Sequence, residues 1–99
     1  MGPLRRHGES RVKTKYRKKF LADLARIPSG RRKAIETFVF NEVPQLESLG
    51  SSGKIERMKD YKSCYKARFG PYRVGLSIEN DIVTFERVLD RKEIYRFFP

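Results

Sequence analysis

Three cationic side chains are concentrated between Cys64 and Arg73, in the stretch CYKARFGPYR. If this stretch is a strand, alternation places Lys66 and Arg68 on one face, and the Gly-Pro pair suits a two-residue hairpin turn. In that register Arg73 lies directly across from Arg68. Like charges paired across two strands are destabilising, whereas a bound anion would stabilise all three cations. The spacing therefore favours a site for phosphate groups.

A second group of candidates lies in the stretch DRKEIYRFF, which contains Arg91, Lys92, Tyr95 and Arg96. If RKEIY forms one helical turn, Arg91 and Tyr95 are i, i+4 neighbours on one face. Tyr95 and the earlier Tyr61 each offer a ring on which an unpaired base could stack. Taken singly, the cations of both groups also suit the solvated face of a half-exposed sheet, and the two tyrosines suit ordinary core or rim packing.

Acidic and hydroxyl side chains are expected on the same face as the cations. A second hairpin would place Glu86 across from Gly75, and Gly75 across from Lys66. The Glu86 carboxylate is therefore expected within reach of the Lys66 ammonium. Ser77 and Thr84 are expected on this face as well, because strand side chains alternate.

The composition is that of a small and strongly basic domain. The 99 residues carry 23 Lys and Arg against 12 Asp and Glu, a net charge of +11, and 38% are hydrophobic. This charge favours a polyanionic partner such as nucleic acid. No apolar run approaches the length of a membrane span, and the N-terminus lacks the apolar core of a secretory signal. We therefore expect a cytoplasmic protein without membrane contact.

Most familiar catalytic groups are missing from the sequence. The only histidine, His7, lies in the aperiodic first ten residues, and Cys64 is the only cysteine. These counts argue against histidine-pair catalysis, an intramolecular disulfide and a His- or multi-cysteine metal site. We expect neither a metal nor a cofactor. Catalysis would then depend on electrostatic stabilisation and on proton transfer by Lys, Arg, Tyr or a carboxylate, which suits phosphodiester cleavage.

Periodicity predicts the helices that support these side chains. Residues 1–10 are expected to be a mobile basic arm, native or added, and residues 11–99 a single domain that opens with an edge strand over 11–16. Pro44 predicts a kink or break in the second helix, with Val43 moved out of the α-helical region. Apolar side chains at helical spacing define the two helices: Phe20, Leu21, Leu24 and Ala25 in the first, and Ala34, Ile35, Phe38, Val39, Val43, Leu46 and Leu49 in the second.

The second half of the chain has the pattern of strands. Four short runs, IERMKDY, CYKARF, YRVGLSIE and DIVTFERVL, are separated by turn signals. Asn80-Asp81 suits a second tight hairpin, because both residues tolerate positive φ. We therefore expect an α+β fold, with an antiparallel meander and two N-terminal helices packed on one face. The side chains expected on its core face are Tyr72, Val74, Leu76, Ile78, Val83 and Phe85.

The sequence also resembles a known family. RKKFLADLARIP, a second helix, and MKDYKSCYKARFGPYRVGLSIENDIVTFERVLDRKEIY together resemble the RelE branch of the RelE/ParE toxin superfamily. The resemblance runs from about Val12 to Tyr95 and is strongest from Met58 onward, where it depends on the order and spacing of several motifs. It implies a type II toxin–antitoxin toxin with the small α+β fold, acting as a ribosome-dependent endoribonuclease that cleaves mRNA in the ribosomal A site.

The resemblance implies roles for individual side chains. It marks as catalytic Lys66, Arg68, Arg73, Arg91 and Tyr95. In this hypothesis Lys66 or a nearby carboxylate removes the 2′-hydroxyl proton, and the arginines stabilise the phosphate and the leaving oxygen. Tyr95 stacks on or orients a base, and the general acid is left open between Arg91 and Tyr95. Tyr61, Lys92 and Arg96 are expected to bind substrate.

Two features of the chain depart from the family pattern. Some relatives carry a histidine or a catalytic glutamate near the site, whereas this chain offers Glu86 or Glu93 as a substitute proton acceptor. Few residues follow Tyr95, so we expect little room for a C-terminal helix.

The expected partners are mRNA in the ribosomal A site and an acidic or amphipathic antitoxin. Operator DNA would be bound only through that antitoxin. Two other functions are open to the same fold and charge: a ParE-like toxin that inhibits gyrase, and a nucleic-acid-binding module without catalysis.

Overall fold

The computed structural model describes residues 12–99; the expected arm over residues 1–10, together with Arg11, lies outside the described residues. The elements follow in the order β1 (Lys13–Tyr16), α2 (Lys18–Ala25), α3 (Ser29–Glu36), the π-helix η1 (Thr37–Glu42), α4 (Val43–Gln45), the 3₁₀ turn η2 (Leu49–Ser51), β2 (Ile55–Arg57), β3 (Cys64–Phe69), β4 (Tyr72–Glu79), β5 (Ile82–Asp90) and α5 (Ile94–Phe97).

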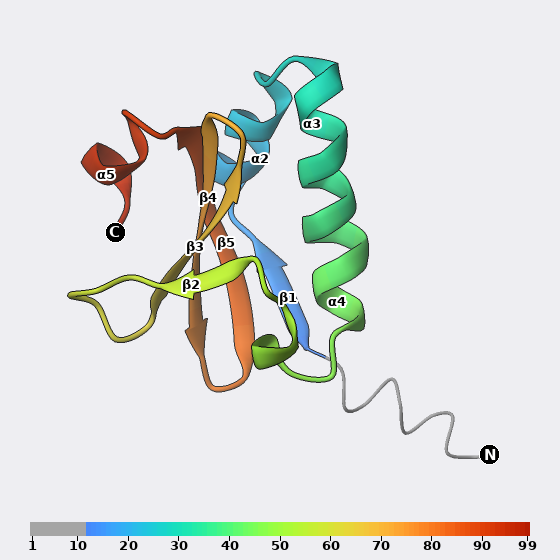
Figure 1. Cartoon of the computed structure of the whole chain (residues 1–99), viewed down its shortest axis with the longest axis vertical. Coiled ribbons are helices and arrows are strands. Elements are labelled where there is room, and N and C mark those ends of the chain that lie inside the picture. The colour runs from blue at the N-terminus through green and yellow to red at the C-terminus, as the bar shows by residue number, and fades with distance from the viewer. Residues whose placement is uncertain (1–11) are drawn as a thin grey trace.

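The strands form one five-stranded sheet in the order β1-β5-β4-β3-β2 (Figure 1). The meander from β2 to β5 is antiparallel as predicted. The sheet as a whole is mixed, because the edge strand β1 pairs with β5 in parallel. Helices α3 and α4 lie on one side of the sheet and α5 on the other, which we call the α3 side and the α5 side. The predicted α+β class is confirmed.

The main core lies between the sheet and the N-terminal helices. It is built from large apolar side chains that are almost completely buried: Phe20, Leu24, Ile35, Phe38, Val39 and Val43 from the helices, and Ala67, Val74, Leu76, Val83, Phe85 and Val88 from the sheet. Most of the predicted stripes are therefore correct. Leu21, Ala25 and Ala34 are exceptions, because their side chains are exposed. Leu46 and Leu49 pack partly buried against the core but lie beyond the end of the second helix.

The second helix passes through Pro44 without a break. Val43 keeps α-helical angles, φ −61° and ψ −44°, so the prediction that it leaves this region is wrong. The wider turn of the π-helix η1 ends immediately before α4. Such a turn changes the hydrogen-bond register, which accommodates a residue that cannot donate a backbone N–H. The helix ends soon afterwards, where Leu46 is extended.

Both predicted hairpin turns are present. Gly70 has φ +60°, as a two-residue turn beginning with glycine requires. Asn80 and Asp81 have φ values of +51° and +66°, which identifies a turn of the I′ kind. Arg68 consequently pairs with Arg73 across the first hairpin, as the spacing predicted.

A β-bulge changes the register of the second hairpin. Leu76 pairs with Phe85, but Gly75 pairs with Arg87, so Glu86 is an extra residue in β5. The prediction that Glu86 faces Gly75 is therefore wrong. Bulges redirect side chains next to functional sites. Here the bulge leaves Glu86 and Arg87 lining the same pocket.

A buried carboxylate closes the edge of β5 beyond the end of β1. Asp23 of α2 is 5% exposed. It accepts hydrogen bonds from Arg87 Nε at 2.7 Å, from Arg87 Nη2 at 3.0 Å and from the Val88 N–H at 3.1 Å. The hydrogen bonds to Asp23 raise the pKa of Arg87. A polar residue thus occupies an inward position of α2, because the strand edge needs an acceptor there.

A smaller apolar cluster holds α5 against the sheet. Met58, Ile94 and Phe98 are buried together, with Cys64 and Leu89 packed around them. The Phe98 ring lies over Gly75, where a Cβ would come within 2.5 Å of it. A short C-terminal helix is therefore present, contrary to the expectation of little room for one. No helix within residues 12–99 is long and apolar enough to cross a membrane.

Candidate nucleic-acid interface

Lys66, Arg68 and Arg73 lie on the α5 side of the sheet, and we call this group the cation face. Their neighbours Tyr65 and Ala67 point into the main core instead. Register places Lys66 across from Gly75 and Arg68 across from Arg73. The predicted grouping of the three cations is therefore confirmed.

Lys66 is in contact with Tyr95. Lys66 Nζ donates a hydrogen bond to Tyr95 Oη at 2.9 Å and lies 5.4 Å from the centre of the ring. The tyrosine remains 54% exposed, so its ring and hydroxyl are available to a ligand. The contact depends on α5, which places a residue distant in sequence beside the middle of β3. An ammonium and a phenol on one open surface can bind a phosphate and transfer a proton.

Arg73 braces the hairpin turn. Arg73 Nη1 donates to the carbonyl oxygens of Gly70 at 2.8 Å and Tyr72 at 2.9 Å. These bonds explain how Arg73 is held across from Arg68 without a carboxylate between them. Arg68 is exposed and forms no side-chain hydrogen bond within the described residues. Arg73 is therefore preorganised by backbone carbonyls, and the neighbouring Arg68 side chain is free to bind an anion.

Arg91 lies at the same end of the sheet, but it is not part of the predicted helical turn. Its backbone N–H donates to the Pro71 carbonyl at 2.8 Å, so it lies beside the β3–β4 turn. Residues 91–93 form a turn and α5 begins at Ile94, so RKEIY is not one helical turn. Arg91 and Tyr95 are therefore not helical i, i+4 neighbours. The exposed Arg91 side chain makes no ion pair within residues 12–99.

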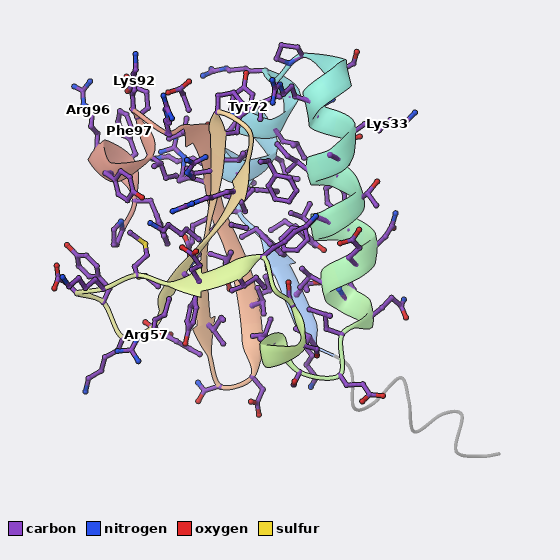
Figure 2. The ribbon with its side chains drawn as sticks, viewed as in Figure 1. Lys33, Arg57, Tyr72, Lys92, Arg96 and Phe97 are labelled. Atoms are coloured by element: carbon purple, nitrogen blue, oxygen red, sulfur yellow. The ribbon has the colours of Figure 1, made fainter. Side chains whose placement is uncertain are left out.

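Of the three side chains expected to bind substrate, two lie around α5 and one lies elsewhere. Lys92 and Arg96 project around α5 (Figure 2), and Arg96 pairs with Glu93 at 3.6 Å. Tyr61 is 48% exposed in the connection between β2 and β3. No ring contact or hydrogen bond within the described residues joins the Tyr61 side chain to the cation face. The structure thus places Lys92 and Arg96 close to Tyr95 in sequence and around the same helix, but leaves Tyr61 separate.

The expected proton acceptors have other partners. Glu86 Oε1 accepts from Arg17 Nε at 3.1 Å, and its Oε2 accepts from Ser77 Oγ at 2.8 Å. Glu93 pairs with Arg96. No hydrogen bond or ion pair joins Glu86 to Lys66 within the described residues, and the Glu86 oxygens bind Arg17 and Ser77 instead. A carboxylate that sequence reasoning missed, Glu56, stands across from Lys66 on β2.

Arg87 and Phe97 were also missed from the sequence. Arg87 lies 5.3 Å above the Phe97 ring while it binds Asp23, and Phe97 is 52% exposed. Strict alternation from Val83 and Phe85 would have turned Arg87 toward the core. Only the bulge, for which the sequence has no clear signal, reverses this. Within residues 12–99, no three His, Cys, Asp or Glu side chains gather closely enough to hold a metal ion.

Comparison with known proteins identifies the class to which this fold belongs. The family model described as the ParE toxin of type II toxin–antitoxin systems, parDE, matches residues 14–95. The chain therefore belongs to this toxin family.

Within the family the chain is RelE-like. Toxin RelE3 of Methanocaldococcus jannaschii is 36% identical over 89 residues, which are 89% of this chain and 100% of that protein. A chain of the RelB-RelE antitoxin-toxin complex from Methanococcus jannaschii matches with a TM-score of 0.72 and 35% identity, covering 86% of this chain and 99% of that one. A chain of the toxin-antitoxin complex RelBE2 from Mycobacterium tuberculosis shares the fold, with a TM-score of 0.64 and 19% identity over 82% of this chain and 99% of that one.

Proposed function

We propose that this RelE-like toxin is an endoribonuclease that cleaves mRNA in the ribosomal A site, and so stops translation in the cytoplasm. The observation that carries the proposal is the contact between Lys66 and Tyr95 beside the Arg68–Arg73 pair. These side chains present charge and a titratable hydroxyl on one open surface. Phosphodiester cleavage concentrates negative charge on the phosphate, and preorganised cations stabilise such charge strongly.

In the proposed reaction, the 2′-oxygen of the RNA attacks the adjacent phosphorus. A 2′-oxygen–phosphorus bond forms, the bond from phosphorus to the 5′-oxygen breaks, and the products are a cyclic phosphate and a 5′-hydroxyl. Arg68 and Arg73 stabilise the phosphate, and Arg91 assists at the leaving oxygen. The 2′-hydroxyl proton passes either to the Glu56 carboxylate or to Lys66 in its neutral amine form, because an ammonium has no lone pair to accept it. A Glu56→Gln variant separates these two acceptors.

Tyr95 is the better donor of the proton that the leaving 5′-oxygen needs. Its Oη already accepts from Lys66, so its own proton is directed elsewhere. Arginine does not lose its proton in proteins, which argues against Arg91 in this role. The ring of Tyr95 can orient a base in addition.

The decisive experiment is primer extension on a translated mRNA, with and without ribosomes. We expect cuts at codon positions only when ribosomes are present. Lys66→Ala and Tyr95→Phe should each reduce them by roughly a hundredfold, the scale for loss of a group that acts in the transition state. Lys33→Ala is the matched control, because Lys33 projects from α3 on the opposite side (Figure 2). Full cutting by both site variants would refute the proposed chemistry.

We also propose a cognate antitoxin with an acidic or amphipathic segment. The chain carries a net charge of +11, and the similar structure from Methanococcus jannaschii is described as an antitoxin-toxin complex. In this proposal operator DNA is bound only through the antitoxin. Expression of the intact toxin alone should slow bacterial growth, and co-expression of the antitoxin should restore it. Normal growth without the antitoxin would contradict the proposal, provided that the recovered gene has no inactivating substitution.

A gyrase-directed activity is the second candidate, because the matching family model carries the ParE description. The two activities separate cleanly in assay. Inhibition of gyrase supercoiling without RNA cuts would support the second candidate and contradict the first. Salt-sensitive RNA binding with neither effect would indicate a binding module without catalysis.

A further inference from the structure

An open pocket of about 700 Å³ lies on the α5 side of the sheet, apart from the cation face. None of Lys66, Arg68 and Arg73 lines it. Its walls come from the start of α2, from the bulged part of β5 with the neighbouring strands, and from the last residues of the chain. Cys64 lies in the pocket, two positions from Lys66 on β3, which is about 7 Å along a strand. A nucleotide in the pocket would therefore neighbour one at Lys66.

The Glu86 carboxylate is the acceptor in this pocket. Each of its oxygens is engaged once, Oε1 by Arg17 and Oε2 by Ser77. A carboxylate offers about four acceptor positions, so each oxygen can accept one more hydrogen bond. The side chain is 22% exposed, and that of Arg17 is 63% exposed. Ser77 thus orients the carboxylate from the sheet, while the arginine partner on the open side can move.

An aromatic ring and several cations complete the pocket. Phe97 lines it with half of its surface exposed, and Arg87 lies against the ring. Lys18 and Lys19 join Arg17 at the start of α2. An exposed ring stacks on a base, and surrounding cations attract the phosphates that flank it. The pocket therefore has four cationic side chains, Arg17, Lys18, Lys19 and Arg87, against the two carboxylates of Glu86 and Glu79, which offsets the repulsion between these carboxylates and RNA.

We propose that this pocket binds a guanine base of the RNA strand next to the scissile phosphate, and that Glu86 is the residue that selects it. Guanine presents two adjacent donors, N1–H and the N2 amino group, on its Watson–Crick edge. Two carboxylate oxygens can accept both. Adenine, cytosine and uracil each present a single donor in that edge, next to an acceptor that would repel the second carboxylate oxygen. This inference rests on the proposed function, since it concerns the substrate of the same surface.

The test compares cut sites of the intact wild-type toxin and a Glu86→Gln variant on translated mRNA. Wild type should favour guanine at one fixed position relative to the cut. The glutamine variant should reduce the preference for guanine over the other bases by about tenfold, the discrimination expected of one bidentate contact. Glu79→Gln is the matched control, because Glu79 also lines the pocket but lies on β4 beyond the bulge. An unchanged preference in a folded Glu86→Gln protein would overturn the inference.

A second measurement keeps the inference independent of cleavage. The ribotrinucleotides U-G-U, U-A-U and U-C-U are titrated against wild-type toxin and against the Glu86→Gln variant. Wild type should bind U-G-U most tightly, and the variant should lose that difference. Equal affinities for the three probes would overturn the guanine pocket even if ribosome-dependent cleavage is observed. If cleavage is absent while U-G-U binding is selective, the proposed function fails and the pocket stands.

Discussion

Replacing Arg73 with alanine tests whether the cation face acts on RNA or only stabilises a hairpin. The guanidinium donates two hydrogen bonds to backbone carbonyls of the turn, at 2.8 and 2.9 Å. Hydrogen bonds from a charged donor contribute roughly 1.5–3 kcal/mol each when buried, but Arg73 is only half-buried, so we take about 1–2 kcal/mol for both. Relief of the like charge of Arg68 returns about 0.2–1 kcal/mol. The net loss of stability should be about 1 kcal/mol.

That loss is too small to account for a large loss of activity. A shift of 1 kcal/mol lowers the Tm of a domain of this size by roughly 4–8 °C. With a total stability of about 5–15 kcal/mol, nearly all molecules stay folded. Loss of one preorganised charge-stabilising group should nevertheless reduce cleavage by roughly a hundredfold or more.

The assay combines calorimetry with primer extension in the presence of ribosomes. Arg68→Ala is the informative partner variant, because it removes a cation from the same pair without removing a bond to the turn. We expect Arg68→Ala to keep its Tm and lose cleavage, and Arg73→Ala to lose a little Tm and most of its cleavage. If Arg73→Ala cuts within twofold of wild type, Arg73 serves the hairpin alone and the reasoning is refuted.

Three further predictions concern the framework and the pocket. Gly70→Val should lower stability by about 1 kcal/mol or more and weaken cleavage. Gly70 has φ +60°, which valine adopts only with strain, and an added side chain would also meet the Arg31 guanidinium. An unchanged Tm and activity would contradict this prediction. Asp23→Ala should lower the free energy of unfolding by about 3 kcal/mol, because it leaves Arg87 and the Val88 N–H without their acceptor. Asp23→Asn keeps an oxygen, so its loss in urea titrations should be smaller. Equal losses for the two variants would argue against an edge-capping role. Burial raises the pKa of the Cys64 thiol, and the charges of Glu86 and Glu79 raise it further. Less thiolate therefore forms at pH 8 in the folded protein than in the unfolded chain. Ellman's reagent should react more slowly with the folded protein for this reason. Glu86→Gln should accelerate that reaction; an equal rate in the variant would place Glu86 away from the thiol.

The parts of the fold that could be predicted are those with short-range physical causes. Gly70, and Asn80 with Asp81, marked both turns because few residues tolerate positive φ. Alternation along β4 then fixed which side chains enter the core. The direction of β1 could not be predicted in this way. A strand of four residues pairs in parallel or antiparallel according to where the following helix packs, which is a tertiary effect.

The candidate site also has a part that could be predicted from the sequence and a part that could not. Lys66, Arg68 and Arg73 were found by spacing alone, because a two-residue turn fixes the register of the strands it joins. Arg87 and the true surroundings of Glu86 were missed, since one inserted residue reverses the alternation beyond it. Nothing in the local sequence distinguishes that insertion from a regular strand. The bulge lies next to a contact with α2, in which the Asp23 carboxylate accepts hydrogen bonds from both the Val88 N–H and Arg87.

The contact between Lys66 and Tyr95 depends on Gly75, a residue without a side chain. Helix α5 has four residues, too few to hold its position by its own hydrogen bonds. It is fixed by Ile94 and Phe98, which are buried against Met58 on the α5 side. Phe98 can reach the sheet only because Gly75 has no Cβ, which would otherwise come within 2.5 Å of the ring. Gly75 also pairs with Lys66, so the gap that admits Phe98 lies beside the lysine that Tyr95 must meet. The glycine therefore positions the aromatic half of the candidate site, and the hairpin turn positions the cationic half.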